Sequence, residues 1–197
     1  MGMRLRQLAM ALSRLPAHPQ TQVELEQYPT EGDFAARWIA EMVLQGDLDE
    51  HTRVVDLGAG NGILGIGCKI AGAASALLVE MDEACVHPYP DVTWLVDDVR
   101  AWSGTDVDLV VMNPPWGVQT TRADRAFLDA AFASKTQVVH LLHSAKATHI
   151  EGVAKAAGWT GEVILSGRFR LPAAYAHQSS AMGETEVSVW RFVRRSP

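Results

Sequence analysis

The amino-acid sequence predicts an α/β fold built on a mostly parallel sheet. Seven short apolar runs follow one another along the 197 residues, and segments with helical periodicity separate most of them. Continuous apolar strands that alternate with helices are typical of a parallel sheet covered on both faces. The last two runs follow each other without a helix between them. They therefore predict an antiparallel hairpin that closes the sheet at its C-terminal end.

The N-terminal part of the chain is predicted to be helical. Residues 3–15 place leucines at helical spacing, and Pro16 ends this helix. A second helix is expected over residues 33–44, with Asp33 as its N-cap. Residues 25–30, which read LEQYPT, form a loop between the two helices.

The remaining elements are assigned from the alternation of apolar runs and helical patterns. The expected strands cover residues 53–57, 75–80, 92–97, 107–112, 137–143, 162–171 and 184–193. The expected helices cover residues 63–71, 124–133 and 146–158. The link between the second and third strands contains Pro88 and Pro90, which would interrupt a crossover helix. We therefore expect the sheet to be thinly covered at this edge, where a partner could pack.

Length and composition indicate one domain over residues 1–197. Residues 1–45 form its N-terminal helical segment and residues 52–197 its core. No apolar run approaches the roughly twenty residues of a membrane span, so we expect a cytoplasmic protein that makes no contact with membranes. Cys68 and Cys85 lack metal-ligand or disulfide spacing, and both are predicted to be buried thiols. No metal site is predicted.

The formal net charge of −6 disfavours a protein that coats nucleic acid by bulk electrostatics. Two groups of arginines nevertheless stand out. The first contains Arg4, Arg6 and Arg14, and the second contains Arg168, Arg170, Arg191, Arg194 and Arg195. Each group is compatible both with a solvated face and with contacts to phosphates.

A glycine-rich turn, DLGAGNG, follows the first predicted strand from Asp56 onward. Its glycines allow a tight turn and a close approach to a ligand, and the next helix begins with free N–H groups. A dinucleotide site requires a glycine at position 63, which is isoleucine here. The pattern DxGxGxG instead resembles the cofactor loop of S-adenosylmethionine-dependent methyltransferases. In that family the carboxylate before the glycines helps to hold the methionine end of the cofactor.

Acidic residues end the second and third predicted strands. Glu80 can accept hydrogen bonds from both hydroxyls of a ribose, and a carboxylate at Asp98 or Asp97 can meet an adenine amino group. The carboxyl ends of successive parallel strands meet where ligands bind in open sheets. The alternative is that these acids are solvated loop residues.

The fourth predicted strand leads into the sequence NPPWG, residues 113–117. Its prolines fix the backbone so that the Asn113 side-chain oxygen and the Pro114 carbonyl face one cavity, where Trp116 offers a flat face to a planar substrate. Two acceptors on an exocyclic amine draw its nitrogen toward tetrahedral geometry and free its lone pair. The alternative is a rigid turn between strand and loop.

The pattern [ND]PP[FWY] resembles the catalytic motif of amino methyltransferases acting on adenine, cytosine, guanine or the glutamine amide. This resemblance implies that Asn113, Pro114, Pro115 and Trp116 form the catalytic motif of this chain. Together with LEQYPT and RFRLPAAYAHQSS, it makes the chain similar, from about Leu5 to Val193, to small methyltransferase-like proteins of archaea and eukaryotes. Members of this family modify one adenine at N6 in small-subunit ribosomal RNA.

This resemblance implies a Rossmann-like class I methyltransferase fold and S-adenosyl-L-methionine as the cofactor. The implied cofactor-binding residues are Gln27, Thr30, Asp56, Gly58, Gly60, Asn61, Ile63, Glu80 and Asp98. Tyr28 and Trp116 would line the substrate pocket. The implied partners are RNA and a small zinc-binding activator protein that adds a strand to the sheet. Two alternatives remain open, namely a protein-glutamine or DNA amino methyltransferase and a non-catalytic RNA-binding assembly factor.

Overall fold

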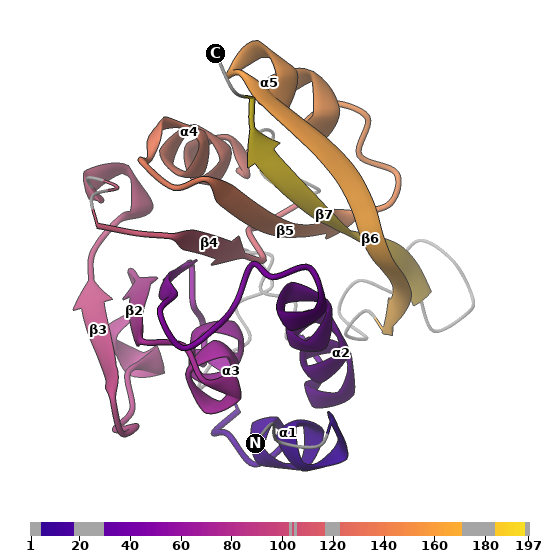
Figure 1. The fold of residues 1–197 in the computed structure, drawn as a ribbon. Helices are drawn as coiled ribbons and strands as arrows, with labels where there is room; N and C mark the ends of the chain where they lie inside the picture. The colour runs from indigo at the N-terminus through magenta and orange to yellow at the C-terminus, as the bar shows by residue number, and fades with distance from the viewer. Residues whose placement is uncertain are drawn as a thin grey trace.

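Seven strands form one sheet in the computed structural model (Figure 1), which describes residues 5–17, 30–102, 104, 106–116, 123–170 and 184–195. The strands are β1 (Arg53–Leu57), β2 (Ser75–Glu80), β3 (Val92–Val96), β4 (Leu109–Met112), β5 (Val138–Ser144), β6 (Trp159–Arg170) and β7 (Glu184–Arg194). Their order is β3-β2-β1-β4-β5-β7-β6. The first five strands pair in parallel, and β7 pairs antiparallel with both β5 and β6. The predicted fold class is confirmed.

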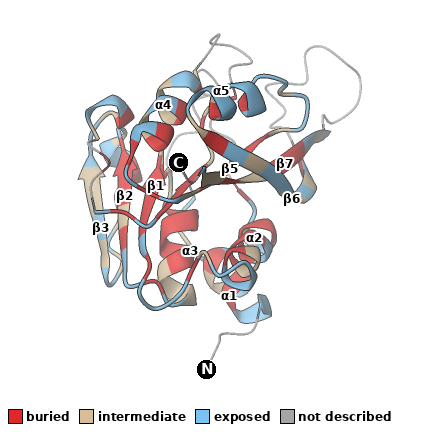
Figure 2. Cartoon of the chain, turned by 45° about the horizontal axis from the view of Figure 1, so that its top comes forward, coloured by how far each residue is buried: buried red, intermediate tan, exposed pale blue. Residues whose placement is uncertain are grey.

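Helices cover both faces of this sheet (Figures 1 and 2). The helices are α1 (Leu5–Leu12), α2 (Gly32–Leu44), α3 (Ile63–Ala71), α4 (Arg125–Ala133) and α5 (Ile150–Ala156). One cluster of buried apolar side chains joins α1, α2 and α3 to one face, and a second joins α4 and α5 to the other. Figure 2 shows the inward sides of α2 and α3 as buried. Among the described helices, none combines the length and the apolar character that crossing a membrane requires.

Several predicted boundaries differ from those in the structure, and three of them are informative. The N-cap of α2 is Glu31, and Asp33 lies in the first turn of the helix, where its charge still complements the helix dipole. Helix α5 begins at Ile150 rather than at residue 146. Strand β6 begins at Trp159 rather than at residue 162, because pairing with β7 extends it. Tertiary pairing, which local sequence does not encode, sets this last boundary.

The link between β2 and β3 contains one short 3-10 helix, η2 (Glu83–Cys85), and no crossover helix. Strand β3 is an edge of the sheet and shows only half-buried and exposed residues, as the tan and pale blue colouring in Figure 2 indicates. The large apolar side chains of Met81, Val86 and Val96 are exposed along this link and edge. The expectation of a thinly covered edge is therefore confirmed.

In the C-terminal group of arginines, Arg168, Arg191, Arg194 and Arg195 make contacts within the chain. Arg194 lies 4.6 Å from the ring centre of Trp159 and donates to backbone carbonyls of the segment before β5. Arg195 donates to Thr160, and Arg168 pairs with Glu184. The chain thus uses these side chains for internal contacts.

The most deeply buried of these contacts centres on Asp47, just after α2. Both oxygens of its carboxylate accept hydrogen bonds from Arg191 of β7, at 2.6 and 2.8 Å. His140 of β5, which is fully buried, lies with its Nε2 2.8 Å from the same carboxylate. Trp38 of α2 donates its indole N–H to His140 Nδ1 (3.2 Å), so Nδ1 is the acceptor and Nε2 carries the proton.

The pKa values in this network agree with its hydrogen bonds. Burial lowers the pKa of His140 and outweighs the opposing effect of Asp47, so the ring stays neutral. Burial raises the pKa of Asp47, but the contacts with His140 and Arg191 outweigh it, so its pKa is lowered and the carboxylate stays ionised. The network therefore joins the end of α2 to two strands by charge-assisted hydrogen bonds.

Replacing Asp47 by alanine is expected to lower the free energy of unfolding by about 3–5 kcal/mol, because it leaves the buried His140 without its partner and the largely buried Arg191 with only Glu162, at 3.4 Å, as a counter-charge. Denaturant unfolding followed by circular dichroism measures the change. The matched control is Glu50→Ala, since the Glu50 side chain is 84% exposed and its loss should change stability by about 0.5 kcal/mol or less. Equal effects of the two substitutions would contradict a stabilising role for the network.

Candidate active site

The carboxyl ends of β1, β2 and β4 bring the predicted site residues to one edge of the sheet. In the register of the sheet, Leu57 lies opposite both Met112 of β4 and Val79 of β2. The next residues, Gly58, Asn113 and Glu80, therefore leave neighbouring strands side by side. This is the edge at which open α/β sheets bind ligands.

The turn after β1 needs its glycines. Gly58, Gly60 and Gly62 have φ values of 70°, 55° and 79°, a region that side chains with a Cβ rarely adopt. A Cβ at Gly58 would also lie 2.6 Å from a ring carbon of Phe127. The backbone N–H of Gly58 donates to Val79 O (2.9 Å), which anchors the turn on β2. A residue with a side chain would therefore strain the backbone of this turn, and at Gly58 it would also collide with Phe127.

Glu80 is buried at the end of β2 and holds the turn in place. Its Oε2 accepts a hydrogen bond from the Gly60 N–H (2.8 Å), and its Oε1 accepts one from the Asp82 N–H (3.0 Å). An ionised carboxylate offers about four acceptor positions. The ordered Glu80 carboxylate therefore suits a ligand that presents paired hydroxyls, as the ribose of S-adenosylmethionine does.

Asp56 lies on β1 beneath this turn and is almost completely buried. Its Oδ2 accepts a hydrogen bond from the Gly65 N–H (2.8 Å), so it ties β1 to the first turn of α3. Burial, together with the nearby charge of Glu80, raises the pKa of Asp56 to about 7. Its expected contact with the methionine end of a cofactor stays a prediction.

Asn61 joins the turn to the N-terminal segment. Its side-chain N–H donates to Pro16 O (3.0 Å), and its Oδ1 accepts from the Ile63 N–H (3.3 Å) at the start of α3. On the other side, His87 Nε2 lies 2.9 Å from Asn61 O. Three separate segments therefore meet at Asn61. The sequence did not indicate that Pro16 and His87 lie beside the glycine turn.

The acids after β3 have different surroundings. Asp98 caps the 3-10 helix η3 (Val99–Ala101), and its carboxylate pairs with the guanidinium of Arg100. Hydrogen bonds from Arg100 lower the pKa of Asp98 to about 2. The Asp97 backbone N–H donates to Glu80 O (3.1 Å), which places this acid next to the glycine turn. Both acids therefore remain candidates for contact with an adenine.

The Asn113 side chain is held between two segments that are far apart in sequence. Its Nδ2 donates to Thr30 Oγ1 (3.2 Å), and its Oδ1 accepts from the indole N–H of Trp116 (3.2 Å). These partners orient the amide, with its oxygen toward Trp116. The LEQYPT segment and the NPPW motif are thus in direct contact through Thr30. Gln27 and Tyr28 lie outside the described residues.

Trp116 differs from the expectation in one respect. Its side chain is only 7% exposed and packs against the rings of His143 and Phe169, with centroid distances of 6.1 and 6.3 Å. Pro114 is also buried, and Pro115 is half-buried. In this structure the indole therefore supports Asn113 and does not form an exposed face. Stacking of a substrate on Trp116 stays a prediction.

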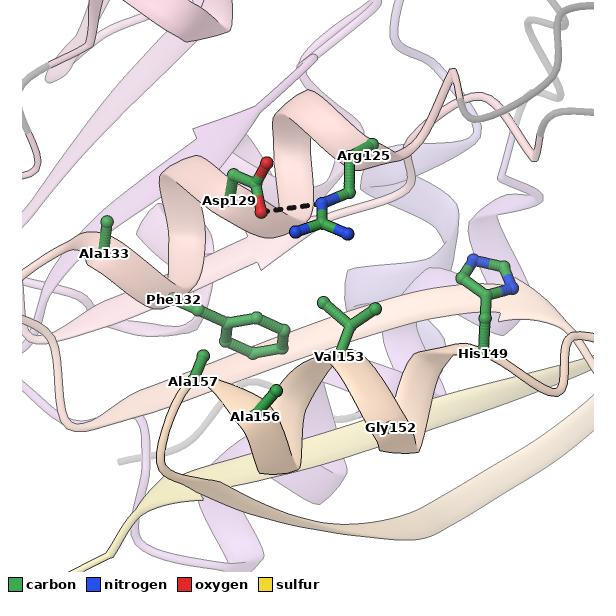
Figure 3. Close-up of a pocket in the computed structure, with 9 residues that line it drawn as sticks. All are labelled: Arg125, Asp129, Phe132, Ala133, His149, Gly152, Val153, Ala156 and Ala157. Atoms are coloured by element: carbon green, nitrogen blue, oxygen red, sulfur yellow. Dashed lines mark hydrogen bonds and ion pairs between the residues drawn. The ribbon is translucent and has the colours of Figure 1, made fainter.

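A groove between α4 and α5 lies apart from these residues (Figure 3). Its lining consists of Arg125, Asp129, Phe132, Ala133, His149, Gly152, Val153, Ala156 and Ala157. None of them belongs to the glycine turn, the strand-end acids or the NPPW motif. The groove is therefore distinct from the candidate active site.

Comparisons with known proteins agree with this geometry. No family model matches the chain. The rRNA N(6)-adenosine-methyltransferase Mettl5 of Drosophila melanogaster is 30% identical over 205 residues, which cover 96% of each chain. Its counterpart METTL5 from Danio rerio is 28% identical and covers 96% of this chain and 99% of its own.

Solved structures share the fold. A proposed RNA methyltransferase of Pyrococcus horikoshii, PH1948, matches with a TM-score of 0.88 and 31% identity over all of both chains. Magnesium protoporphyrin IX methyltransferase from Synechocystis, solved with bound S-adenosylmethionine, matches with a TM-score of 0.60 and 17% identity over 92% of this chain and 88% of its own, which shows a shared fold. The chain belongs to the family of rRNA N6-adenosine-methyltransferases, S-adenosylmethionine-dependent enzymes of the Rossmann-like class I fold.

Proposed function

We propose that the chain methylates N6 of one adenine in ribosomal RNA of the small subunit. The observation that carries this proposal is the Asn113 amide, held by Thr30 and Trp116 beside the glycine turn. Relatives named as rRNA N6-adenosine-methyltransferases support RNA as the substrate. No described contact favours a protein amide or DNA over RNA. A cytoplasmic location stays a prediction.

The glycine turn and the acids beside it are proposed to hold the cofactor. Gly58 and Gly60 allow the backbone to approach it, and Glu80 accepts hydrogen bonds from its ribose. Thr30, Asp56, Asn61, Ile63 and Asp98 complete the proposed set, together with Gln27. When bound, S-adenosylmethionine supplies an electrophilic methyl group on a sulfonium. The buried acids Asp56, whose pKa is raised to about 7, and Glu80 suit a ligand that carries positive charge, because such a ligand favours the ionised form of both.

Asn113 is proposed to act on the exocyclic amine of the target adenine. The amine nitrogen of adenine is a poor nucleophile, because its lone pair is delocalised into the ring. Acceptance of its two hydrogens by Asn113 Oδ1 and Pro114 O favours tetrahedral geometry and localises the lone pair on nitrogen. Methyl transfer would form a bond between N6 and the methyl carbon and break the bond between that carbon and the sulfonium sulfur, which would leave as a neutral thioether. The nitrogen would then release one proton, for which no strong general base is needed. Trp116 keeps the Asn113 amide oriented.

The proposed RNA substrate requires positive charge that Arg191 and Arg194 of β7 do not supply. Arg191 and Arg194 are committed to internal hydrogen bonds, and the chain carries a net charge of −6. Affinity for RNA through phosphate contacts scales with the number of available cations. We infer that the substrate is a structured RNA presented with the help of a partner protein.

A small zinc-binding activator is the proposed partner, docked at β3. The outer edge of β3 offers unpaired backbone groups, and Met81, Val86 and Val96 expose apolar surface beside it. A partner strand added there would pair with the backbone and cover these side chains. The opposite edge, β6, exposes a single large apolar side chain among its described residues, Val163.

Asn113→Ala is expected to lower the rate of methyl transfer by about a hundredfold or more, as removal of one preorganised polar contact does in other enzymes. The assay transfers labelled methyl from S-adenosylmethionine to small-subunit RNA, which is then digested to nucleosides. Cofactor affinity should change little. The matched control is Gln137→Ala, which removes an exposed amide next to β5. Label recovered in protein or DNA and absent from RNA would overturn the choice of substrate, and cofactor binding without any transfer would favour an assembly factor.

Glu80→Gln is expected to weaken S-adenosylmethionine binding by about tenfold to a hundredfold, since a charge-assisted hydrogen bond contributes about 1.5–3 kcal/mol. The amide also replaces one acceptor by a donor, so either Gly60 or Asp82 loses its partner. Equilibrium dialysis with labelled cofactor measures the affinity. Glu83→Gln, at an exposed neighbouring position, serves as the control. Unchanged binding in Glu80→Gln would remove this residue from the cofactor site.

Val96→Lys is expected to weaken binding of the zinc-binding activator by at least about tenfold, because it places a charge where an apolar contact is proposed. Val163→Lys tests the opposite edge at matched exposure, since the two valines are 48% and 46% exposed. Titration of each variant with the purified activator, followed by calorimetry, gives the affinities. A larger loss in Val163→Lys would move the proposed interface to β6, and the absence of any affinity in the wild type would exclude this partner.

A further inference from the structure

Three potential metal ligands meet outside the proposed methyl-transfer machinery. They are Asp124 before α4, His143 near the end of β5 and His149 before α5. One ligand atom from each lies within 4.8 Å of the other two. They come from three different elements, and their sequence spacing matches no common metal motif. The sequence therefore did not indicate the cluster.

The Asp124 carboxylate is turned away from its usual local role. Asp124 occupies the N-cap position of α4, where an aspartate usually accepts a hydrogen bond from the first turn. Its side chain makes no such bond. Its Oδ2 lies 2.5 Å from His149 Nε2 and 3.2 Å from His143 Nε2. His143 and His149 thus each approach Asp124 Oδ2 through their own Nε2 atom.

His143 provides the second, independent observation. Its side chain is 1% exposed, and among the described residues neither of its ring nitrogens has a hydrogen-bond partner. Its Nε2 is close to Asp124 Oδ2 but is not aligned for a hydrogen bond with it. A buried imidazole without an aligned partner costs free energy. His143 therefore lies beside the Asp124 carboxylate without a hydrogen bond to it, whereas His149 Nε2 and Asp124 Oδ2 are hydrogen-bonded, a contact that a bound ion would replace.

We propose that Asp124, His143 and His149 bind a divalent first-row transition-metal ion of the zinc type. Two imidazoles and one carboxylate suit such an ion, whereas magnesium and calcium prefer oxygen ligands. Three protein ligands leave at least one coordination position for water or another ligand. This site is separate from the zinc of the proposed activator, since all its ligands belong to this chain.

The site is accessible to an ion from solvent. The His149 side chain is 49% exposed, while Asp124 and His143 are buried behind it. Figure 3 shows His149 at one end of the groove between α4 and α5, with Ala133 toward the other end. An ion can therefore enter past the half-exposed His149 and reach the two buried ligands.

An ion at this site would join α4, β5 and α5 next to the NPPW motif. The His143 ring packs against Trp116, whose indole donates to Asn113. Metal binding would fix the His143 ring, against which the Trp116 indole packs. The bound ion would thus support the NPPW motif structurally, and this role does not depend on which substrate the enzyme methylates.

The test uses the full chain without an affinity tag of histidines, stripped with a chelator and titrated with Zn²⁺ and Co²⁺. Calorimetry and competition with a chromogenic chelator give stoichiometry and affinity, and Co²⁺ adds a visible absorption spectrum. The wild type should bind one ion per chain and unfold at a higher temperature with it. His149→Ala should weaken binding by at least about tenfold, since loss of even outer-shell partners costs about 10–100-fold.

Controls separate the site from adventitious binding. His51→Ala removes an imidazole that is 85% exposed and should leave affinity and spectrum unchanged. The substitution Asp124→Asn is a second test of the same site, because it alters the carboxylate ligand. Mg²⁺ should not compete with Zn²⁺ for this site. Anaerobic titration with Fe²⁺ distinguishes an iron site from a zinc site. Binding of less than one ion per chain, or equal binding by wild type and His149→Ala, would overturn the proposal. These measurements need neither RNA nor cofactor, so they stand apart from the test of methyl transfer.

Discussion

The buried carboxylate of Asp47 is the constraint on which the candidate active site depends. It fixes the C-terminal end of α2 to β5 and β7, while Trp38 ties the same helix to His140. The helix is a rigid rod about 20 Å long at 1.5 Å per residue. Thr30 lies just before its other end and contacts Asn113. The position of the Asn113 amide is therefore linked, through one helix, to the ion pair between Asp47 and Arg191.

The sequence predicted the sheet well because its strands are continuous apolar runs with clear boundaries. Strands β1 and β2 and helix α3 have the predicted bounds, and the N-cap of α2 was wrong by two residues. The predictions weakened where partners are distant in sequence. The contact between Asp47 and Arg191 spans 144 residues. Arg191 and Arg194, for which the sequence left phosphate contacts open, are internal partners.

The candidate site shows the same division. Glycine spacing and strand-end acids identified the edge of the sheet, because both belong to local patterns that a parallel sheet brings together. The burial of Trp116 against His143 and Phe169 was not predictable, since it arises from β5 and β6. The cluster of Asp124, His143 and His149 was missed for the same reason. Local sequence encodes strands and turns, whereas the assembled sheet decides which side chains meet across them.

The position of β7 has a consequence for how the chain folds during synthesis. β7 lies between β5 and β6, yet both of these strands are made before it. Strand β6 has no place in the sheet until β7 has left the ribosome, and the Arg191 partner of Asp47 arrives with it. Pairings of such high sequence separation form slowly. A nascent chain therefore exposes the edge of β5 until β7 has been synthesised, and only then does the helix that follows Thr30 become locked in place.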